Sequence, residues 1–262
     1  MFHDIEYRNQ GPAGLILHNR PDARNAESRR LLDEMDAALD LAVADPQVRV
    51  IVIGGNGPHF SAGHDLKEAQ HDRQDFTVEE RWAYEQQRYF DYALKIWDCP
   101  KPTIARVQGG CIAGGFMVAN MCDLIVAADD AFFADPVVRT MAAAAVEVLI
   151  HPWVMGLRSA KEFLYTGARM TAARAHEIGM VNRVVPRDDL EAETLALAEQ
   201  IAQTPPFALQ LVKRSLNRSF DAQGFRTALA AHFDLHQLSH VTDELARNRG
   251  AGLADAIGRG KA

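Results

Sequence analysis

Phe60-Ser-Ala-Gly-His-Asp-Leu-Lys67 and Gln108-Gly-Gly-Cys-Ile-Ala-Gly-Gly-Phe116 are the two segments that decide the interpretation of this chain. Each follows an apolar, β-branched run that is typical of a buried strand, and each has small residues where the chain must turn sharply. Two such turns lying side by side could aim two peptide N–H groups at one oxygen atom. That arrangement stabilises an oxyanion without using a side chain.

Length and composition narrow the class of protein. With 262 residues the chain can bury a large core, and we expect one domain, alone or with a helical appendage. No run approaches the roughly 18 apolar residues of a membrane span, and the first residues do not resemble a signal peptide, so a cytoplasmic protein without a membrane partner is expected. The net charge of −7 argues against a nucleic-acid partner. The three cysteines form no metal-type cluster and are expected to be reduced and partly buried.

The apolar patterns predict strands mixed with helices, followed by helices alone. The predicted strands are 5–8, 14–18, 48–53, 103–107, 124–128, 131–134 and 180–185. The predicted helices are 27–43 (with Ser28 as N-cap), 78–97, 114–121, 158–165, 171–177, 190–203 and 207–219. The polar segment 67–77 is expected to be a mobile surface loop. This order indicates an α/β core with a helical C-terminal extension.

Further segments, in order along the chain, resemble the crotonase superfamily, the enoyl-CoA hydratase/isomerase fold. Besides the two segments quoted above, they are Leu17-His-Asn-Arg-Pro-Asp-Ala-Arg-Asn-Ala26, Val48-Arg-Val-Ile-Val-Ile53, Cys99-Pro-Lys-Pro-Thr-Ile-Ala105, Cys122-Asp-Leu, Phe163-Leu-Tyr-Thr-Gly167, Ala173-Arg-Ala-His-Glu-Ile-Gly-Met-Val-Asn-Arg-Val-Val-Pro186 and Leu211-Val-Lys-Arg-Ser-Leu216. The likeness covers nearly the whole chain.

The resemblance implies an α/β, crotonase-like spiral of repeated ββα units. It implies a core with the acyl-CoA site in residues 1–200 and a helical trimerisation region in residues 201–262. The expected assembly is a homotrimer or a dimer of trimers. The expected substrate is an acyl-CoA thioester, with coenzyme A as part of the substrate and no separate cofactor. The resemblance places the thioester oxygen between the backbone N–H groups of His64 and Gly114.

The chain departs from the family pattern at the two positions that usually carry catalytic glutamates. These positions are Met117 and Val137, whose side chains cannot transfer a proton. Glu147 is the first candidate for a replacement, because burial among Ala and Val residues would raise the pKa of its carboxyl. The alternative is an exposed glutamate at the start of a helix. Weaker candidates, for which a turn, a solvated loop face and core packing are the alternatives, are Asp135, Glu68 and His151.

For other residues near the two turns, the sequence supports a functional role less strongly or leaves a structural alternative open. The backbone of His64 is the stronger candidate, and its side chain is expected to point away from the substrate carbonyl. Ser61 lacks the G-x-S-x-G pattern of a serine hydrolase. Arg24 or Lys67 could meet a phosphate of coenzyme A, the alternative being solvated surface cations. The full set of substrate-binding candidates is Arg24, Ala26, Ala62, His64, Asp65, Leu66, Lys67, Ile112, Gly114, Met117 and Val137.

Three functions remain open from the sequence. The leading hypothesis is an enoyl-CoA hydratase-like lyase that adds water to an enoyl-CoA. The second is another reaction through the same enolate, such as isomerisation, decarboxylation or thioester hydrolysis. The third is an acyl-CoA-binding scaffold without catalysis. No metal is expected, because no set of His, Cys and carboxylate residues shows ligand spacing along the sequence.

Overall fold

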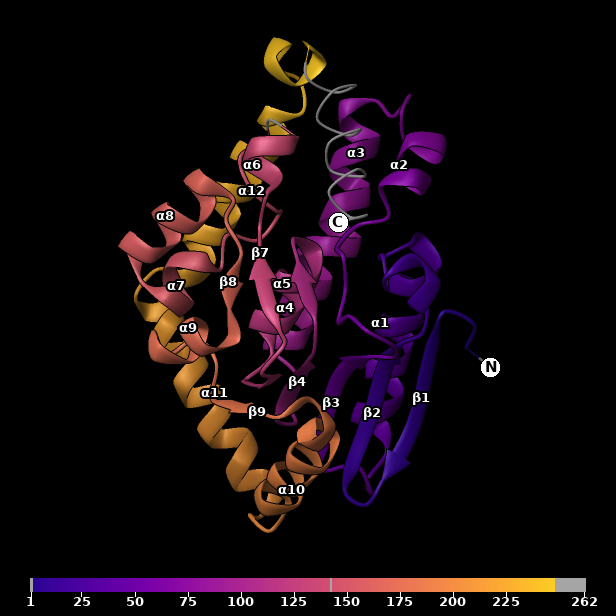
Figure 1. Ribbon diagram of the computed structural model, residues 1–262, viewed down its shortest axis with the longest axis vertical. Helices are drawn as coiled ribbons and strands as arrows, with labels where there is room; N and C mark the ends of the chain where they lie inside the picture. Colours follow the sequence, from indigo (N-terminus) through magenta and orange to yellow (C-terminus); the bar gives the residue numbers. More distant parts are fainter. Residues whose placement is uncertain (1, 142, 248–262) are drawn as a thin grey trace.

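A six-stranded sheet forms the centre of the computed structural model, which describes residues 2–141 and 143–247 (Figure 1). The strands lie in the order β1-β2-β3-β4-β6-β9; β1 runs antiparallel to β2, and the other neighbours are parallel. Their bounds are β1 (Ile5–Gln10), β2 (Ala13–His18), β3 (Val50–Gly55), β4 (Thr103–Val107), β6 (Leu124–Ala128) and β9 (Arg183–Val185). Every residue of β3 is buried, as a continuous β-branched run in a parallel sheet predicts.

Helices cover both faces of this sheet. On one face, α1 (Arg29–Ala44) contacts β1 and β2, and the Ser28 hydroxyl accepts the N–H of Leu31 at 3.1 Å, which confirms the predicted N-cap. On the other face, α10 (Leu190–Ala202) buries Leu190 and Leu197 against the sheet. This helix spans the predicted domain boundary at residue 200, and the division itself stays a prediction.

A smaller sheet positions the second glycine-rich turn next to the first. It consists of β5 (Gly110–Ile112), β7 (Phe132–Ala134) and β8 (Met170–Thr171). The helix α5 (Gly114–Met121) begins directly after β5 and is buried along its whole length. The predicted strand 103–107 (β4) and helix 114–121 (α5) are confirmed, whereas β5 forms within the segment that was expected to be a turn.

The long helix predicted at 78–97 is present but is interrupted by a π-helical segment. It consists of α3 (Val78–Glu85), the π segment η2 (Gln86–Asp91) and α4 (Tyr92–Trp97). A π segment shifts the side chains that follow it relative to a regular helix. Tyr89 and Phe90 lie within this segment and are both buried.

The prediction of a surface loop at 67–77 is wrong in its first half. Residues Leu66–Asp72 form the helix α2. The Asp65 carboxylate caps this helix by accepting the N–H groups of Lys67 and Glu68, both at 3.1 Å. A good N-cap stabilises a short polar helix that has no buried apolar stripe.

The remaining elements are mostly helical. They are η1 (Pro21–Ala23), α6 (Val137–Thr140), α7 (His151–Met155), α8 (Leu157–Thr166), α9 (Ala172–Glu177), η3 (Arg187–Asp189), α11 (Pro206–Ala222) and α12 (Phe225–Ser239). The helix α12 lies within the helical region expected at 201–262 but was not predicted as a separate helix, and it packs Phe233 against Trp82 and Phe90 of the long helix. No helix among the described residues is both long and apolar enough to cross a membrane. All three cysteines are free and buried.

Candidate active site

The two small-residue turns meet, as the sequence predicts. Ile112 donates its N–H to the Ser61 carbonyl at 3.0 Å, and Ser61 donates its N–H to the Gly110 carbonyl at 3.1 Å. A Cβ added to Gly63 would lie 2.8 Å from the Ile112 carbonyl oxygen and 3.1 Å from the Gly114 nitrogen. Gly63 also has a φ of +83°, so glycine is favoured here by both conformation and space.

Two backbone N–H groups at this junction have no acceptor among the described residues. One belongs to Gly114, the first residue of α5, and the other to His64. Glu27 pairs with the residues on either side of His64, because Glu27 donates to the Gly63 carbonyl at 2.8 Å and accepts from Asp65 at 3.1 Å. Neither N–H is used within the described chain, and that of Gly114 is one of the free donors that a helix N-terminus leaves.

The residue before Gly114 has an unusual backbone conformation. Ala113 has φ +49° and ψ −111°, a combination that favours glycine. Its N–H donates to the Ala134 carbonyl at 2.9 Å, which ties the turn to β7. Strain of this kind persists where the surrounding contacts fix the chain, and it often accompanies functional turns.

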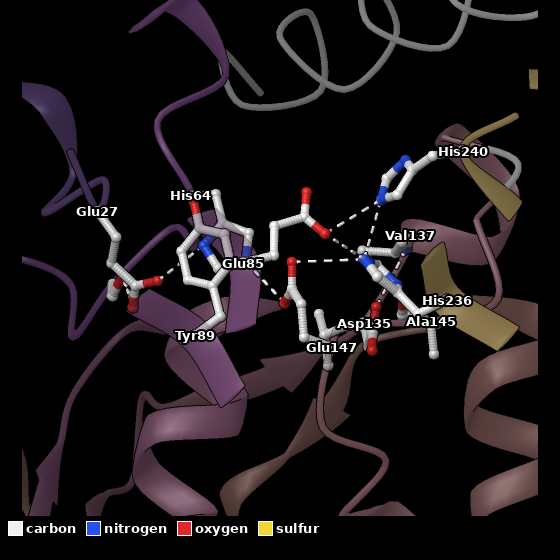
Figure 2. Close-up of polar contacts among 12 residues, drawn as sticks. Glu27, His64, Glu85, Tyr89, Asp135, Val137, Ala145, Glu147, His236 and His240 are labelled. Atoms are coloured by element: carbon white, nitrogen blue, oxygen red, sulfur yellow. Dashed lines mark hydrogen bonds and ion pairs between the residues drawn. The ribbon is translucent and has the colours of Figure 1, made fainter. Parts of the chain in front are cut away.

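The His64 ring lies inside the junction, between two carboxylates (Figure 2). Its Nδ1 is 3.1 Å from Glu27 Oε2, and its Nε2 is 3.0 Å from Glu147 Oε2. The ring also stacks on Tyr89, with 3.7 Å between ring centroids. An acidic partner therefore holds each ring nitrogen, and the expectation that the side chain points away from the substrate carbonyl stays a prediction. A Cβ on Gly114 would lie 2.7 Å from the His64 ring, so only glycine leaves room for it.

Glu147 is buried, with 3 % of its surface exposed, so the alternative of an exposed helix-start glutamate is wrong. The expected direction of its pKa shift is also wrong. Burial by itself would raise the pKa of this carboxyl, but the imidazoles of His64 and His236 outweigh burial and lower it. For His64, burial disfavours the charged ring, but Glu147 and Glu27 more than offset it and raise the pKa of the imidazole to about 10. The site therefore holds an imidazolium between two carboxylates at neutral pH.

The network of ionisable side chains continues beyond Glu147 to further residues that the sequence analysis did not single out. His236 Nε2 is 3.5 Å from Glu147 Oε1 and 3.3 Å from Glu85 Oε2, and His240 Nε2 is 3.5 Å from the same Glu85 oxygen. The signal was present in α12, where His232, His236 and His240 recur at four-residue spacing and so share one helix face. The search for ligand spacing along the sequence missed Glu85, His236 and His240, whose polar atoms lie within 4.8 Å of one another, and the expectation of no metal stays a prediction.

The two positions that usually carry catalytic glutamates have apolar side chains in this protein, and both side chains are at least partly buried. Met117 is 1 % exposed on α5, and Val137 is half-buried at the start of α6. Asp135 Oδ2 is 3.1 Å from His151 Nε2, although the pair is not aligned for a hydrogen bond. Both side chains are fully buried, and the His151 ring stacks on Phe116. Among the described residues, no hydrogen bond or ion pair joins this pair to His64 or Glu147.

Some of the remaining candidate site residues make hydrogen bonds within the fold, and others are exposed on the surface. The Asp65 carboxylate caps α2 and accepts from Arg20 at 3.0 Å, and the Glu68 carboxylate accepts the Arg29 N–H at 2.8 Å. Their proposed roles toward a substrate stay predictions. Ala62 donates its N–H to the Arg24 carbonyl at 3.0 Å. The Ala26 carbonyl accepts from Arg20 at 2.5 Å.

Ser61 is used structurally. Its hydroxyl donates to the Asn25 carbonyl at 2.9 Å and accepts the Gly63 N–H at 3.0 Å, which shapes the first turn. Lys67 is exposed on α2, whereas Leu66 faces a cavity between α2, α3 and the end of α12. Arg73, Phe76, Met141 and His240 are among the other residues lining this cavity.

Comparison with known proteins gives consistent results. The family model described as enoyl-CoA hydratase/isomerase matches residues 9–253. The chain is 40 % identical over 259 residues to EchA13 of Mycobacterium tuberculosis (strain H37Rv), which is named as a provisional enoyl-CoA hydratase; the match covers 92 % of this chain and 81 % of the relative.

Two solved structures extend the likeness to the fold. A crystal structure of a protein from Mycobacterium smegmatis, described as a probable enoyl-CoA hydratase, has 48 % sequence identity and a TM-score of 0.85, and covers 90 % of this chain and 94 % of its own. An enoyl-CoA hydratase/isomerase from Xanthobacter autotrophicus Py2 has 36 % identity and a TM-score of 0.91, with coverage of 98 % and 97 %.

Proposed function

Because this chain belongs to the enoyl-CoA hydratase/isomerase family, we propose that it binds an acyl-CoA thioester and hydrates an enoyl-CoA. The observation that carries the proposal is the pair of backbone N–H groups, at His64 and Gly114, that have no acceptor among the described residues. A thioester oxygen placed between them would gain negative charge as the enolate forms. Two preformed donors, one of them at a helix N-terminus, would stabilise that charge.

Glu147 is the proposed acid and base. Hydration forms a bond from water oxygen to the β-carbon, moves one water proton to a base, and places a proton on the α-carbon. One carboxylate can perform both transfers if it takes the water proton and then gives it to the α-carbon. The usual positions cannot, since Met117 and Val137 have no ionisable group. The lowered pKa makes Glu147 ionised at neutral pH but also a weak base, so slow hydration is expected.

His64 is the proposed positioning residue. As an imidazolium it donates to Glu147 and Glu27 and holds the Glu147 carboxylate beside the junction of the turns. Its positive charge lies near the developing enolate, where it adds to the effect of the backbone donors.

The test is the loss of enoyl absorbance with crotonyl-CoA, comparing the natural chain with Glu147→Gln. The substitution is expected to lower kcat by about 10²–10⁴-fold, the typical contribution of one acid–base group. The matched control is Glu162→Gln, an exposed glutamate on α8 that is expected to leave the rate unchanged. Equal rates for both variants would remove Glu147 from the mechanism. Calorimetric binding of an acyl-CoA without turnover by the natural chain would favour the scaffold instead.

Isomerisation is a second candidate, favoured because Glu147 alone replaces the two catalytic glutamates of hydratases of the usual pattern. Moving a proton from the α-carbon of a 3-enoyl-CoA to its γ-carbon requires a single group that first accepts and then donates. Turnover of a 3-enoyl-CoA that exceeds turnover of the matching 2-enoyl-CoA would select this reaction over hydration.

A further inference from the structure

Glu85, His236 and His240 form a compact group that the proposed reaction does not use. Glu85 is the last residue of α3, and the two histidines lie one turn apart at the C-terminal end of α12 (Figure 2). Glu85 and His236 are 4 % and 3 % exposed. These residues come from segments about 150 positions apart in the sequence, and their polar atoms converge.

The spacing of these atoms is that of ligands around one ion. The two Nε2 atoms are 3.0 Å apart, and Glu85 Oε2 lies 3.3 Å from His236 Nε2 and 3.5 Å from His240 Nε2. Zinc binds nitrogen and oxygen ligands at about 2.0–2.2 Å, and two such ligands at roughly 90–110° lie about 3.0–3.5 Å apart. All three separations fall in this range.

The surrounding contacts orient the ligands in the way that metal sites require. His236 Nδ1 is 2.7 Å from the Ala145 carbonyl, so Nδ1 carries a proton, and Nε2, which faces Glu85 and His240, is the atom that would give up its proton to bind a metal ion. Gln237 donates its side-chain amide to Glu85 Oε2 at 2.7 Å and holds the carboxylate in place. Such outer contacts fix the tautomer and the ring direction of ligating residues.

An ion can reach this group from the cavity between α2, α3 and α12. His240 and Gln237 line that cavity, and the His240 side chain is 17 % exposed. Within the described chain, no further His, Cys, Asp or Glu joins the group. Three protein ligands leave at least one coordination position for water or another donor entering from the cavity.

We propose that Glu85, His236 and His240 bind one divalent metal ion of the zinc class. Two imidazoles and one carboxylate are ligands suited to Zn²⁺ and to Co²⁺ or Ni²⁺, and less suited to Ca²⁺ or Mg²⁺, which prefer oxygen ligands alone. The ion would join α3 to α12 on the side of the cavity. This proposal does not depend on the reaction proposed above.

The experiment measures metal binding to the full chain, prepared without a polyhistidine tag and stripped with chelator. Titration calorimetry with ZnCl₂ should give one site per chain, and His240→Ala should weaken the binding by at least about 100-fold, more than the loss of an outer contact. The control His71→Ala removes an exposed histidine of α2 and should bind like the natural chain. Glu85→Gln supplies a second ligand variant if His240→Ala fails to fold by circular dichroism.

Two further measurements are independent of activity. X-ray absorption of the Zn²⁺-loaded chain should show two imidazoles in the first shell at about 2.0–2.1 Å. Saturating Zn²⁺ should raise the thermal midpoint of the natural chain and of His71→Ala but not of His240→Ala. The absence of saturable binding, or binding that His240→Ala and Glu85→Gln leave unchanged, would overturn the proposal and leave a network that shares only protons.

Discussion

At the scale of single residues, the charge of His64 is the feature with the widest consequences. Its imidazole lies between two buried carboxylates, and these hold its pKa at about 10 against the opposing effect of burial. A ring with this pKa is a cation throughout the neutral range. It can therefore position Glu147 and stabilise an enolate, but it cannot act as a base at pH 7.

An NMR titration of His64 checks this charge. We predict that the ring stays protonated up to about pH 9 in the natural chain, and that Glu147→Gln lowers its pKa because one anionic partner is lost. The sign of the linked stability follows from the raised pKa. The contribution of His64 is complete below its unfolded value of 6.5 and is lost as the pH rises through about 10. A ring that titrates near 6.5 in the folded chain would contradict the assignment.

The sequence was sufficient to single out Glu147 and His64 but not to describe their relation. Glu147 stood out because an acidic residue among Ala and Val residues is unusual. The direction of the His64 ring depends on Glu27 and Tyr89, which are remote in sequence, and on the space above Gly114. No local pattern encodes such contacts, and the same is true of the lowered pKa of Glu147.

At the scale of elements, the turn before α5 combines strain with a functional position. Ala113 has φ +49°, which costs an L-residue free energy that glycine would not pay. We predict that Ala113→Gly raises the free energy of unfolding by about 1 kcal/mol, the lower end of the usual cost of such conformations. Ala119→Gly is the comparison within α5. It should lower the free energy of unfolding by about 0.5–1 kcal/mol or more, because glycine is unfavourable inside a helix. Urea denaturation of both variants gives the answer, and a destabilised Ala113→Gly would show that Ala113 is not strained.

Most elements were predictable from periodicity, and the exceptions have physical reasons. The helix α2 was assigned to a loop because its residues are polar, although Asp65 and Glu68 give the spacing of an N-terminal cap. The π segment at Gln86–Asp91 leaves no mark in an apolar pattern that continues through it. Hydrophobic periodicity reports burial, and it does not report capping or a change of helix type.

At the scale of the whole molecule, exposed apolar side chains gather on α11 and α12. Phe207 is 67 % exposed, and Leu216 and Leu238 are 63 % and 61 % exposed. Large apolar groups in such numbers are typical of a surface that another protein covers. By contrast, Lys213 on the same helix α11 is buried, with Nζ 2.8 Å from Asp123 Oδ2, so its ammonium is used within its own chain.

We predict that this surface forms the trimer expected from the family resemblance. Light scattering should give about three times, or six times, the 29.0 kDa mass of one chain. The double variant Val212→Asp and Leu216→Asp places two charges on one side of α11 and should reduce the mass to that of a monomer. Leu41→Asp, on an exposed position of α1, should leave the mass unchanged. A natural chain that is monomeric at micromolar concentration would contradict the prediction.

The fold and the family could be predicted from sequence segments spread over the whole chain. The arrangement of the site residues could be predicted only in part. Strands and turns depend on local composition, so the arrangement around Gly63 and Gly114 was accessible from sequence. The series of side-chain contacts that runs from Glu27 to His240 joins five elements or connections of the fold. These contacts exist only because the fold brings those elements together.

A crystal structure with a bound acyl-CoA is the most direct measurement of the central claim. The account predicts that the thioester oxygen lies about 2.7–3.1 Å from the backbone nitrogens of both His64 and Gly114. A bound thioester whose oxygen faces solvent, or lies beyond hydrogen-bonding distance of either nitrogen, would contradict it.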